Sequence, residues 1–163
     1  MIIGVPKEIQ SDEKRVALVP RGVEALKKMG FEVLVESGAG IHADYGNPKY
    51  EEVGAEIIAN TTELWNRSDI VAKVREPLPH EADMLKSSGT LISFFWPDKN
   101  GALLEHLSNK KTTVLAMDCI PRINRAERMD AISSLANVAG YRAVVDAAHA
   151  FPHYFTGQVT AAG

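Results

Sequence analysis

Short apolar runs alternate with segments of helical periodicity along this chain. Residues 2–5 are apolar and are followed by Pro6, a pattern that predicts a first strand. Apolar side chains at helical spacing over residues 20–29, with Gly30 behind them, predict a helix. The same two patterns predict further strands at residues 31–35, 56–58, 70–74, 90–95 and 113–117, and short helices around residues 50–53, 81–85 and 103–107.

The last predicted element is also the longest. A helical pattern begins at Asp130 and is expected to extend to about Phe155, with Leu135, Val138 and Val145 on one apolar stripe.

Strands that alternate with helices indicate an α/β fold. We predict an open, mainly parallel sheet with helices on both faces, flavodoxin-like in outline, which ends in the long helix. Two parts are expected: an α/β domain at residues 1–129, and the helix with a linker at residues 130–163.

Composition narrows the class of protein. The 163 residues are 45% hydrophobic and 24% charged, which is typical of a globular domain with a solvated surface. A net charge of −3 argues against a nucleic-acid partner, which usually binds a basic face. No apolar run approaches the roughly 18–20 residues of a membrane span, so a membrane link is expected only through a partner. The single cysteine, Cys119, excludes an intramolecular disulfide and fits a cytoplasmic setting.

Several local signals favour a structural interpretation over a functional one. Residues 37–40 (Ser-Gly-Ala-Gly) lack the third glycine of a dinucleotide loop, so a turn after a strand is favoured. His149 and His153 are expected to share a helix face, but no third ligand is near in sequence, and no metal site is predicted. Cys119 has no evident basic partner and is interpreted as a structural thiol. Arg15 is either a surface residue or a bidentate hydrogen-bond donor to a carboxylate or an amide.

The charged loop at residues 122–130 offers the best position for chemistry. It follows a predicted strand and precedes the longest helix, so it is expected at the carboxyl end of the sheet, where open α/β sheets bind ligands. Asp130 can also cap the helix that follows. A solvated loop and a ligand-contacting loop both remain open on these grounds.

Many short motifs resemble one known family. The chain is similar throughout to the amino-terminal half shared by alanine dehydrogenases and the NAD(H)-binding component of proton-translocating NAD(P) transhydrogenases. The motifs that carry the resemblance are Gly4-Val5-Pro6-Lys7-Glu8, Arg15-Val16-Ala17, Val35-Glu36-Ser37-Gly38-Ala39-Gly40, Gly54-Ala55-Glu56-Ile57, Lys73-Val74-Arg75-Glu76-Pro77, Ser93-Phe94-Phe95-Trp96-Pro97 and the stretch from Asp130 to Tyr141.

Two positions separate the branches of that family. Arg75 stands where alanine dehydrogenases have the lysine that contacts the pyruvate carbonyl, and Trp96 stands where they have the acid/base histidine. Oxidation of an amino acid needs a group that takes and returns a proton, and an indole cannot do this. The resemblance therefore favours the transhydrogenase branch, in which hydride passes directly between two nicotinamides.

The resemblance also implies site residues. Arg122, Glu127 and Asp130 fall on a loop that contacts NAD(H) in the family, and they are the expected catalytic positions. Arg122 and Ser133 would hold the carboxamide, while Glu127 replaces a glutamine that reaches the NADP(H) ribose of the partner. The full set of expected cofactor-binding residues is Arg122, Glu127, Arg128, Met129, Asp130, Ala131, Ser133 and Tyr141.

The implied function is that of the amino-terminal portion of a proton-pumping transhydrogenase component. NAD(H) is the implied cofactor, and NADP(H) is expected on a partner component. The implied partners are membrane-embedded and NADP(H)-binding subunits, with a homodimer in the complete protein. The implied location is cytoplasmic, peripheral to the inner (plasma) membrane.

The long helix is expected to lead to an NAD-binding Rossmann domain beyond residue 163, so the chain alone is expected to be inactive. Two alternatives remain: an alanine dehydrogenase-like domain in which Arg15 and Arg75 grip a carboxylate, and a non-catalytic interaction domain.

Overall fold

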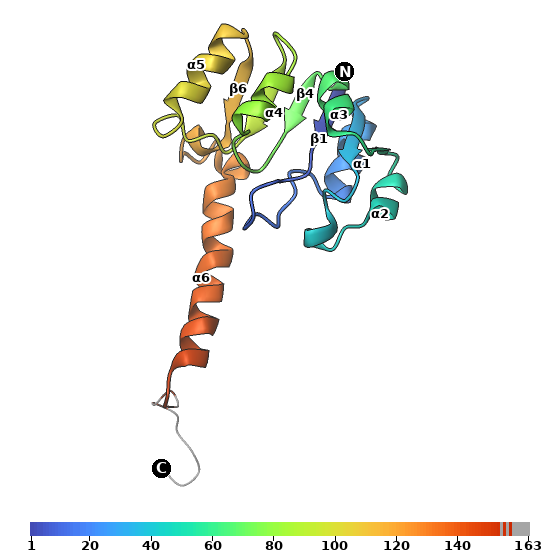
Figure 1. Cartoon of the computed structure of the whole chain (residues 1–163). Helices are drawn as coiled ribbons and strands as arrows, with labels where there is room; N and C mark the ends of the chain where they lie inside the picture. Colours follow the sequence, from blue (N-terminus) through green and yellow to red (C-terminus); the bar gives the residue numbers. More distant parts are fainter. Residues whose placement is uncertain (154, 156, 158–163) are drawn as a thin grey trace. The chain divides into compact units, whose positions relative to one another are not determined.

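The computed structural model describes residues 1–153, 155 and 157. The chain forms two compact units, Met1–Ile120 and Pro121–Gly163. The first unit contains the strands β1 (Ile2–Val5), β2 (Glu32–Glu36), β3 (Glu56–Ile58), β4 (Ile70–Ala72), β5 (Thr90–Ser93) and β6 (Thr113–Ala116). Its helices are α1 (Pro20–Lys28), α2 (Asn47–Glu51), α3 (Thr61–Arg67), α4 (Pro79–Met84) and α5 (Gly101–Asn109) (Figure 1).

The six strands form one parallel sheet in the order β3-β2-β1-β4-β5-β6. The predicted open, parallel α/β fold is confirmed. The strand order is the doubly wound 3-2-1-4-5-6 arrangement, whereas flavodoxin-like sheets run 2-1-3-4-5. The order reverses between β1 and β4, and sheets of this kind bind ligands beyond the carboxyl ends of the strands at that reversal.

Two hydrophobic cores lie on opposite faces of the sheet. Side chains alternate between faces along a strand, and in β2 Leu34 belongs to one core while Val33 and Val35 belong to the other. The core that contains Leu34 also holds buried side chains of α3, α4 and α5, including Trp65. The second core holds buried side chains of α1 and α2. Helices therefore cover both faces, as the sequence predicts.

Gly4 in the central strand β1 is a point of very close approach. A Cβ atom at this position would lie 1.9 Å from Ser68 Oγ and 2.9 Å from Ser68 Cβ. Ser68 ends α3 and is fully buried, and its hydroxyl donates to the carbonyl of Leu64 at 2.6 Å. Only glycine at position 4 lets α3 pack this closely on the strand.

Glu36, the last residue of β2, fastens the loop that follows β1. Its Oε2 accepts from the backbone N–H of Lys7 at 2.8 Å, and its Oε1 accepts from the hydroxyl of Thr61 at 2.6 Å. One carboxylate thus joins the ends of β1 and β2 to the start of α3.

The second unit contains a 3₁₀ turn at Glu127–Met129 and the helix α6 (Ala131–Ala150). The prediction that this helix extends to about Phe155 is wrong. Phe151 has an extended ψ of 120° and precedes Pro152, whose ring disfavours helical geometry in the residue before it. His153 consequently lies beyond the helix and does not share a helix face with His149. The predicted apolar stripe is exposed in this structure, with Val138 at 64%.

Candidate functional site

The loop before α6 is ordered by its own backbone. The N–H of Ala126 donates to the carbonyl of Ile123 at 2.8 Å, and the N–H of Met129 donates to that of Ala126 at 2.8 Å. Ala126 is buried, whereas its charged neighbours Arg125 and Glu127 are exposed. Ala126 therefore fixes the loop, while the charged side chains on either side of it are exposed.

Asp130 caps α6, as its position in the sequence predicts. Its Oδ1 accepts from the Ser133 N–H at 3.0 Å, and its Oδ2 accepts from the Ser133 hydroxyl at 2.5 Å. These hydrogen bonds, the hydroxyl first, lower the pKa of Asp130, and the charge of Arg122 adds to the effect. Asp130 is thus hydrogen-bonded to Ser133 and feels the charge of Arg122, and all three residues are predicted for the site.

The other predicted residues are not drawn into this cluster. Arg128 and Met129 are exposed beside Glu127, and Tyr141 is 73% exposed. Tyr141 lies ten residues after Ala131 on α6, which is roughly 15 Å along a helix that rises 1.5 Å per residue. A ligand that touches both Asp130 and Tyr141 must therefore be extended.

A buried charge cluster lies where the strand order reverses. Lys73 follows β4, and its Nζ lies 2.6 Å from Glu81 Oε1 and 3.6 Å from Glu8 Oε2, with Glu8 in the loop after β1. The three side chains are 1–3% exposed. Glu81 also accepts from the N–H of Leu78 at 2.8 Å, at the start of α4. The cluster joins two loops at the carboxyl edge of the sheet to one helix.

Glu8 is the least satisfied member of the cluster. Its Oε1 accepts from the N–H of Val74 at 2.6 Å, but its buried Oε2 has no hydrogen-bond donor among the residues that the structure describes. Burial raises the pKa of Glu8, and the opposing effect of Lys73 is smaller. Two carboxylates compete for one ammonium, and Glu81 holds it more closely.

Arg15 and Arg75 share one carboxylate, that of Glu13. Arg15 donates to Glu13 through Nε at 2.8 Å and Nη2 at 2.6 Å, while Arg75 Nε lies 3.8 Å from Glu13 Oε2 and 3.2 Å from Gln10 Oε1. The hydrogen bond from the Arg15 side chain is the largest cause that lowers the pKa of Glu13. Arg15 and Arg75 are the two residues that could bind a substrate carboxylate. In this structure both guanidinium groups lie against the carboxylate of Glu13 instead.

Trp96 has a backbone conformation that is rare for a bulky residue. Its φ is 51°, and its indole is 39% exposed. Asp118 accepts from the N–H groups of Phe95 at 2.5 Å and Trp96 at 3.0 Å, and the Asn100 side chain donates to the Phe95 carbonyl at 2.7 Å. Because these groups bond to side chains, β5 stops at Ser93 instead of continuing to Phe95 as predicted. The side chains of Asp118 and Asn100 therefore fix the backbone of the loop that carries Trp96.

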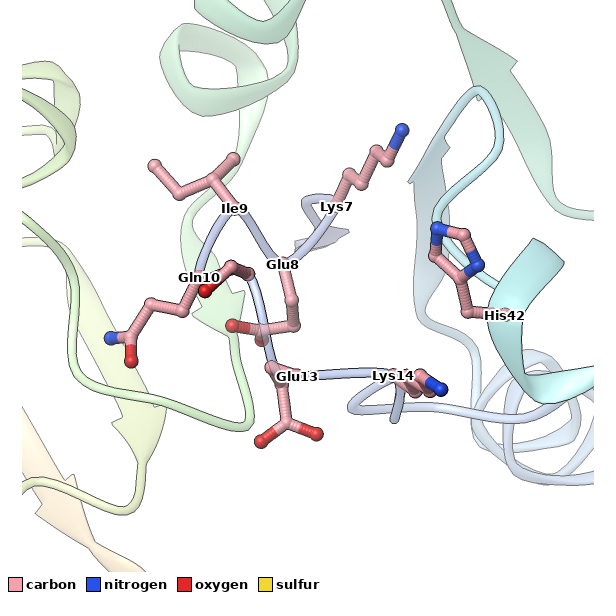
Figure 2. A pocket seen from close by; sticks show the side chains of 8 residues that line it. Lys7, Glu8, Ile9, Gln10, Glu13, Lys14 and His42 are labelled. Carbon is pink, nitrogen blue, oxygen red and sulfur yellow. The ribbon is translucent and has the colours of Figure 1, made fainter.

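A pocket of about 380 Å³ opens beside the loop that follows β1. Its lining is drawn in Figure 2 and consists of Lys7, Glu8, Ile9, Gln10, Ser11, Glu13, Lys14 and His42. His42 comes from the 3₁₀ turn after β2, Ile41–Ala43, so the pocket lies at the carboxyl ends of two neighbouring strands.

Sequence reasoning missed the cluster of Glu8, Lys73 and Glu81. A usable signal was present, because Glu8 and Lys73 closely follow two apolar strands that are neighbours in the sheet. Charged residues at adjacent carboxyl ends are expected to meet.

Within the described part of the chain, no three histidine, cysteine or acidic side chains are grouped to hold a metal ion. The same residues contain no helix that is long and apolar enough to cross a membrane.

Comparison with known proteins identifies close relatives. The family described as "Alanine dehydrogenase/PNT, N-terminal domain" matches residues 4–139. The NAD(P) transhydrogenase subunit alpha of Cereibacter sphaeroides is 49% identical over 163 residues, which is 100% of this chain and 31% of that protein. The chain therefore spans about a third of this curated relative.

Two solved structures, a transhydrogenase and an alanine dehydrogenase, are both similar to this chain but cover different shares of it. The transhydrogenase from Sinorhizobium meliloti superposes with a TM-score of 0.91 at 36% identity, covering 100% of this chain and 48% of that one. An L-alanine dehydrogenase superposes with a TM-score of 0.72 at 35% identity, covering 77% of this chain and 34% of that one.

Proposed function

The chain belongs to the alanine dehydrogenase/PNT N-terminal domain family, and from this membership we propose that it is the amino-terminal part of the NAD(H)-binding component of a proton-pumping NAD(P) transhydrogenase. The proposal rests on how much of this chain each solved structure covers. The transhydrogenase structure covers 100% of this chain, whereas the alanine dehydrogenase structure covers 77% at nearly the same identity. The transhydrogenase subunit alpha of Cereibacter sphaeroides likewise matches 100% of this chain.

The chemistry at the carboxyl edge supports the same branch. The side chain at position 96 is an indole on a clamped loop, and it cannot exchange a proton with an amino group. Arg75 lies against Gln10 and Glu13, and a guanidinium group has no acceptor with which to take up a proton. Direct hydride transfer asks only for positioning and a suitable electrostatic environment, which these residues can provide.

We therefore expect no alanine dehydrogenase turnover from the full-length parent protein. The measurement is NADH formation from alanine and NAD, and NADH consumption with pyruvate and ammonia. Steady turnover in either direction would show that another group supplies the acid/base function and would favour the alternative, an amino-acid dehydrogenase.

The loop before α6 is the part of this chain that we assign to NAD(H). NAD(H) supplies the hydride chemistry when bound, and the residues that would hold it are Arg122 and Ser133, beside a deprotonated Asp130. The side chain of Arg122 makes no hydrogen bond among the described residues, so its donors are free for an amide oxygen. Ser133 keeps an acceptor lone pair after it donates to Asp130.

Glu127 carries the sharpest test of this assignment. An ionised carboxylate only accepts hydrogen bonds, whereas the glutamine usual in the family also donates. We expect Glu127→Gln to raise the rate of hydride transfer about fivefold, the effect of one hydrogen bond of about 1 kcal/mol, with little change in NADH affinity. Stopped-flow transfer between NADH and an NADP analogue in the full-length subunit, assembled with its partners, measures both quantities.

A matched control separates the loop from general charge effects. Glu105→Gln removes another exposed acid, from α5, and should leave the transfer rate unchanged. In the same assay Arg122→Ala should lower turnover without loss of folding. If neither loop variant changes the rate, the loop has no part in transfer and only caps the helix.

The assembly follows from the same proposal. NADP(H) would bind a partner component, and membrane-embedded subunits would carry the protons. The NAD(H) component would lie on the cytoplasmic side, peripheral to the inner (plasma) membrane, and would form a homodimer in the complete protein. Residues 130–163 would connect the α/β domain to a Rossmann domain of the complete protein.

A further inference from the structure

The pocket beside the loop after β1 has an uneven set of charges. Its two carboxylates already have partners, since Glu13 binds Arg15 and Glu8 faces Lys73. Its three basic side chains, Lys7, Lys14 and His42, make no side-chain hydrogen bond and no ion pair within the described residues. The groups left free to bind a ligand are therefore basic.

These three residues come from two separate loops and line the same pocket. Figure 2 shows His42 between Lys7 and Lys14 in the view, with the carboxylates of Glu8 and Glu13 turned away from it. Lys7 is half-buried, whereas Lys14 and His42 reach solvent. The pocket is therefore open to solvent, and all three of these basic residues belong to its lining.

The backbone that carries the basic groups is fixed before any ligand arrives. The Lys7 N–H is held by Glu36, and a turn closes between the Glu13 N–H and the Gln10 carbonyl at 3.0 Å. Tyr45 N–H donates to the Gly40 carbonyl at 2.9 Å, which closes the loop around His42. A preorganised site loses less conformational entropy on binding.

We propose that this pocket is a binding site for a phosphate monoester or inorganic phosphate. Two lysines supply point charges suited to a dianion, and His42 supplies a ring nitrogen donor. The volume of about 380 Å³ is near the lower end for small-molecule sites and leaves room for a sugar or similar small group. The proposal does not rest on the nicotinamide chemistry assigned to the other unit.

The test is a calorimetric titration of the chain with inorganic phosphate and with ribose 5-phosphate, at constant ionic strength so that screening does not change. We expect saturable binding of both, and tighter binding of the sugar phosphate if the rest of the pocket is used. Lys7→Gln combined with Lys14→Gln should weaken binding at least about tenfold, because two charge-assisted contacts are lost.

The matched control is Lys28→Gln, which removes a lysine that is 72% exposed at the far end of α1. Its affinity for phosphate should equal that of the unchanged chain, and circular dichroism should show all variants folded. Absence of saturable binding would overturn the proposal. An equal loss from Lys28→Gln would also overturn it, because attraction would then depend on overall charge. Acetate at the same concentration should bind at least about tenfold more weakly, since it carries half the charge.

Discussion

Replacing Lys73 by methionine should lower the free energy of unfolding by about 3–5 kcal/mol, the usual cost of removing one partner from a buried ion pair. Lys73 is 1% exposed and lies 2.6 Å from Glu81 and 3.6 Å from Glu8. Methionine fills much of the same space but leaves two buried carboxylates without a counter-charge. Urea titration followed by tryptophan fluorescence measures the loss, since Trp65 is fully buried in the core.

The control for this prediction is Glu8→Gln. A glutamine keeps an acceptor for the Val74 N–H, and burial already disfavours the charged form of Glu8. We expect a change within about 1 kcal/mol, close to the net value of one hydrogen bond. If Lys73→Met costs no more than Glu8→Gln, the cluster does not stabilise the carboxyl edge of the sheet.

Gly4→Ala should be the second strongly destabilising change, at about 1–3 kcal/mol or more, the range for overpacking a close-packed core. The new Cβ would lie 1.9 Å from Ser68 Oγ and 2.9 Å from Ser68 Cβ, so a rotation of the hydroxyl cannot relieve the contact alone. Both residues are buried in the described structure, and β1 is bound on both sides by strands.

A double-mutant cycle tests the cause. Ser68→Gly removes both clashing atoms, so Gly4→Ala should cost much less in the Ser68→Gly background, with a coupling of about 1–3 kcal/mol. Urea titration of the four proteins gives the coupling. Additive losses would mean that the strand is disturbed by something other than contact with Ser68.

Most of the first unit could be predicted from local pattern. β1 and β3 have the predicted bounds, because short apolar runs there are closed by Pro6 and by a loop. α2 begins earlier than predicted, at Asn47, since Pro48 suits the first turn of a helix. The helix α3 was missed, although Asn60 caps it by accepting from the Glu63 N–H at 3.0 Å. A short helix with few apolar residues gives too weak a periodicity.

The site could be predicted only in part. The cap at Asp130 follows from local sequence, because an aspartate before a helix has one evident partner three residues on. The cluster of Glu8, Lys73 and Glu81 joins residues up to 73 positions apart. Local patterns place Glu8 and Lys73 after apolar strands, but they do not tell which strands are neighbours in the sheet. The conformation of Trp96 depends on Asp118 in a later segment and was equally out of reach. Long-range polar contacts, more than the fold, limit sequence reasoning here.

Glu36 has a consequence for how this domain should be classified. An acidic residue at the end of the second strand, in a sheet of this order, is where dinucleotide-binding domains hold the ribose hydroxyls. Here both oxygens are occupied by the chain itself, through the Lys7 N–H and the Thr61 hydroxyl. A search that scores strand order together with this acidic residue would report a nucleotide-binding domain. The carboxylate of Glu36, however, has a structural role and hydrogen-bonds within the chain. Classification of such sheets should ask whether the acid is free before it counts the residue.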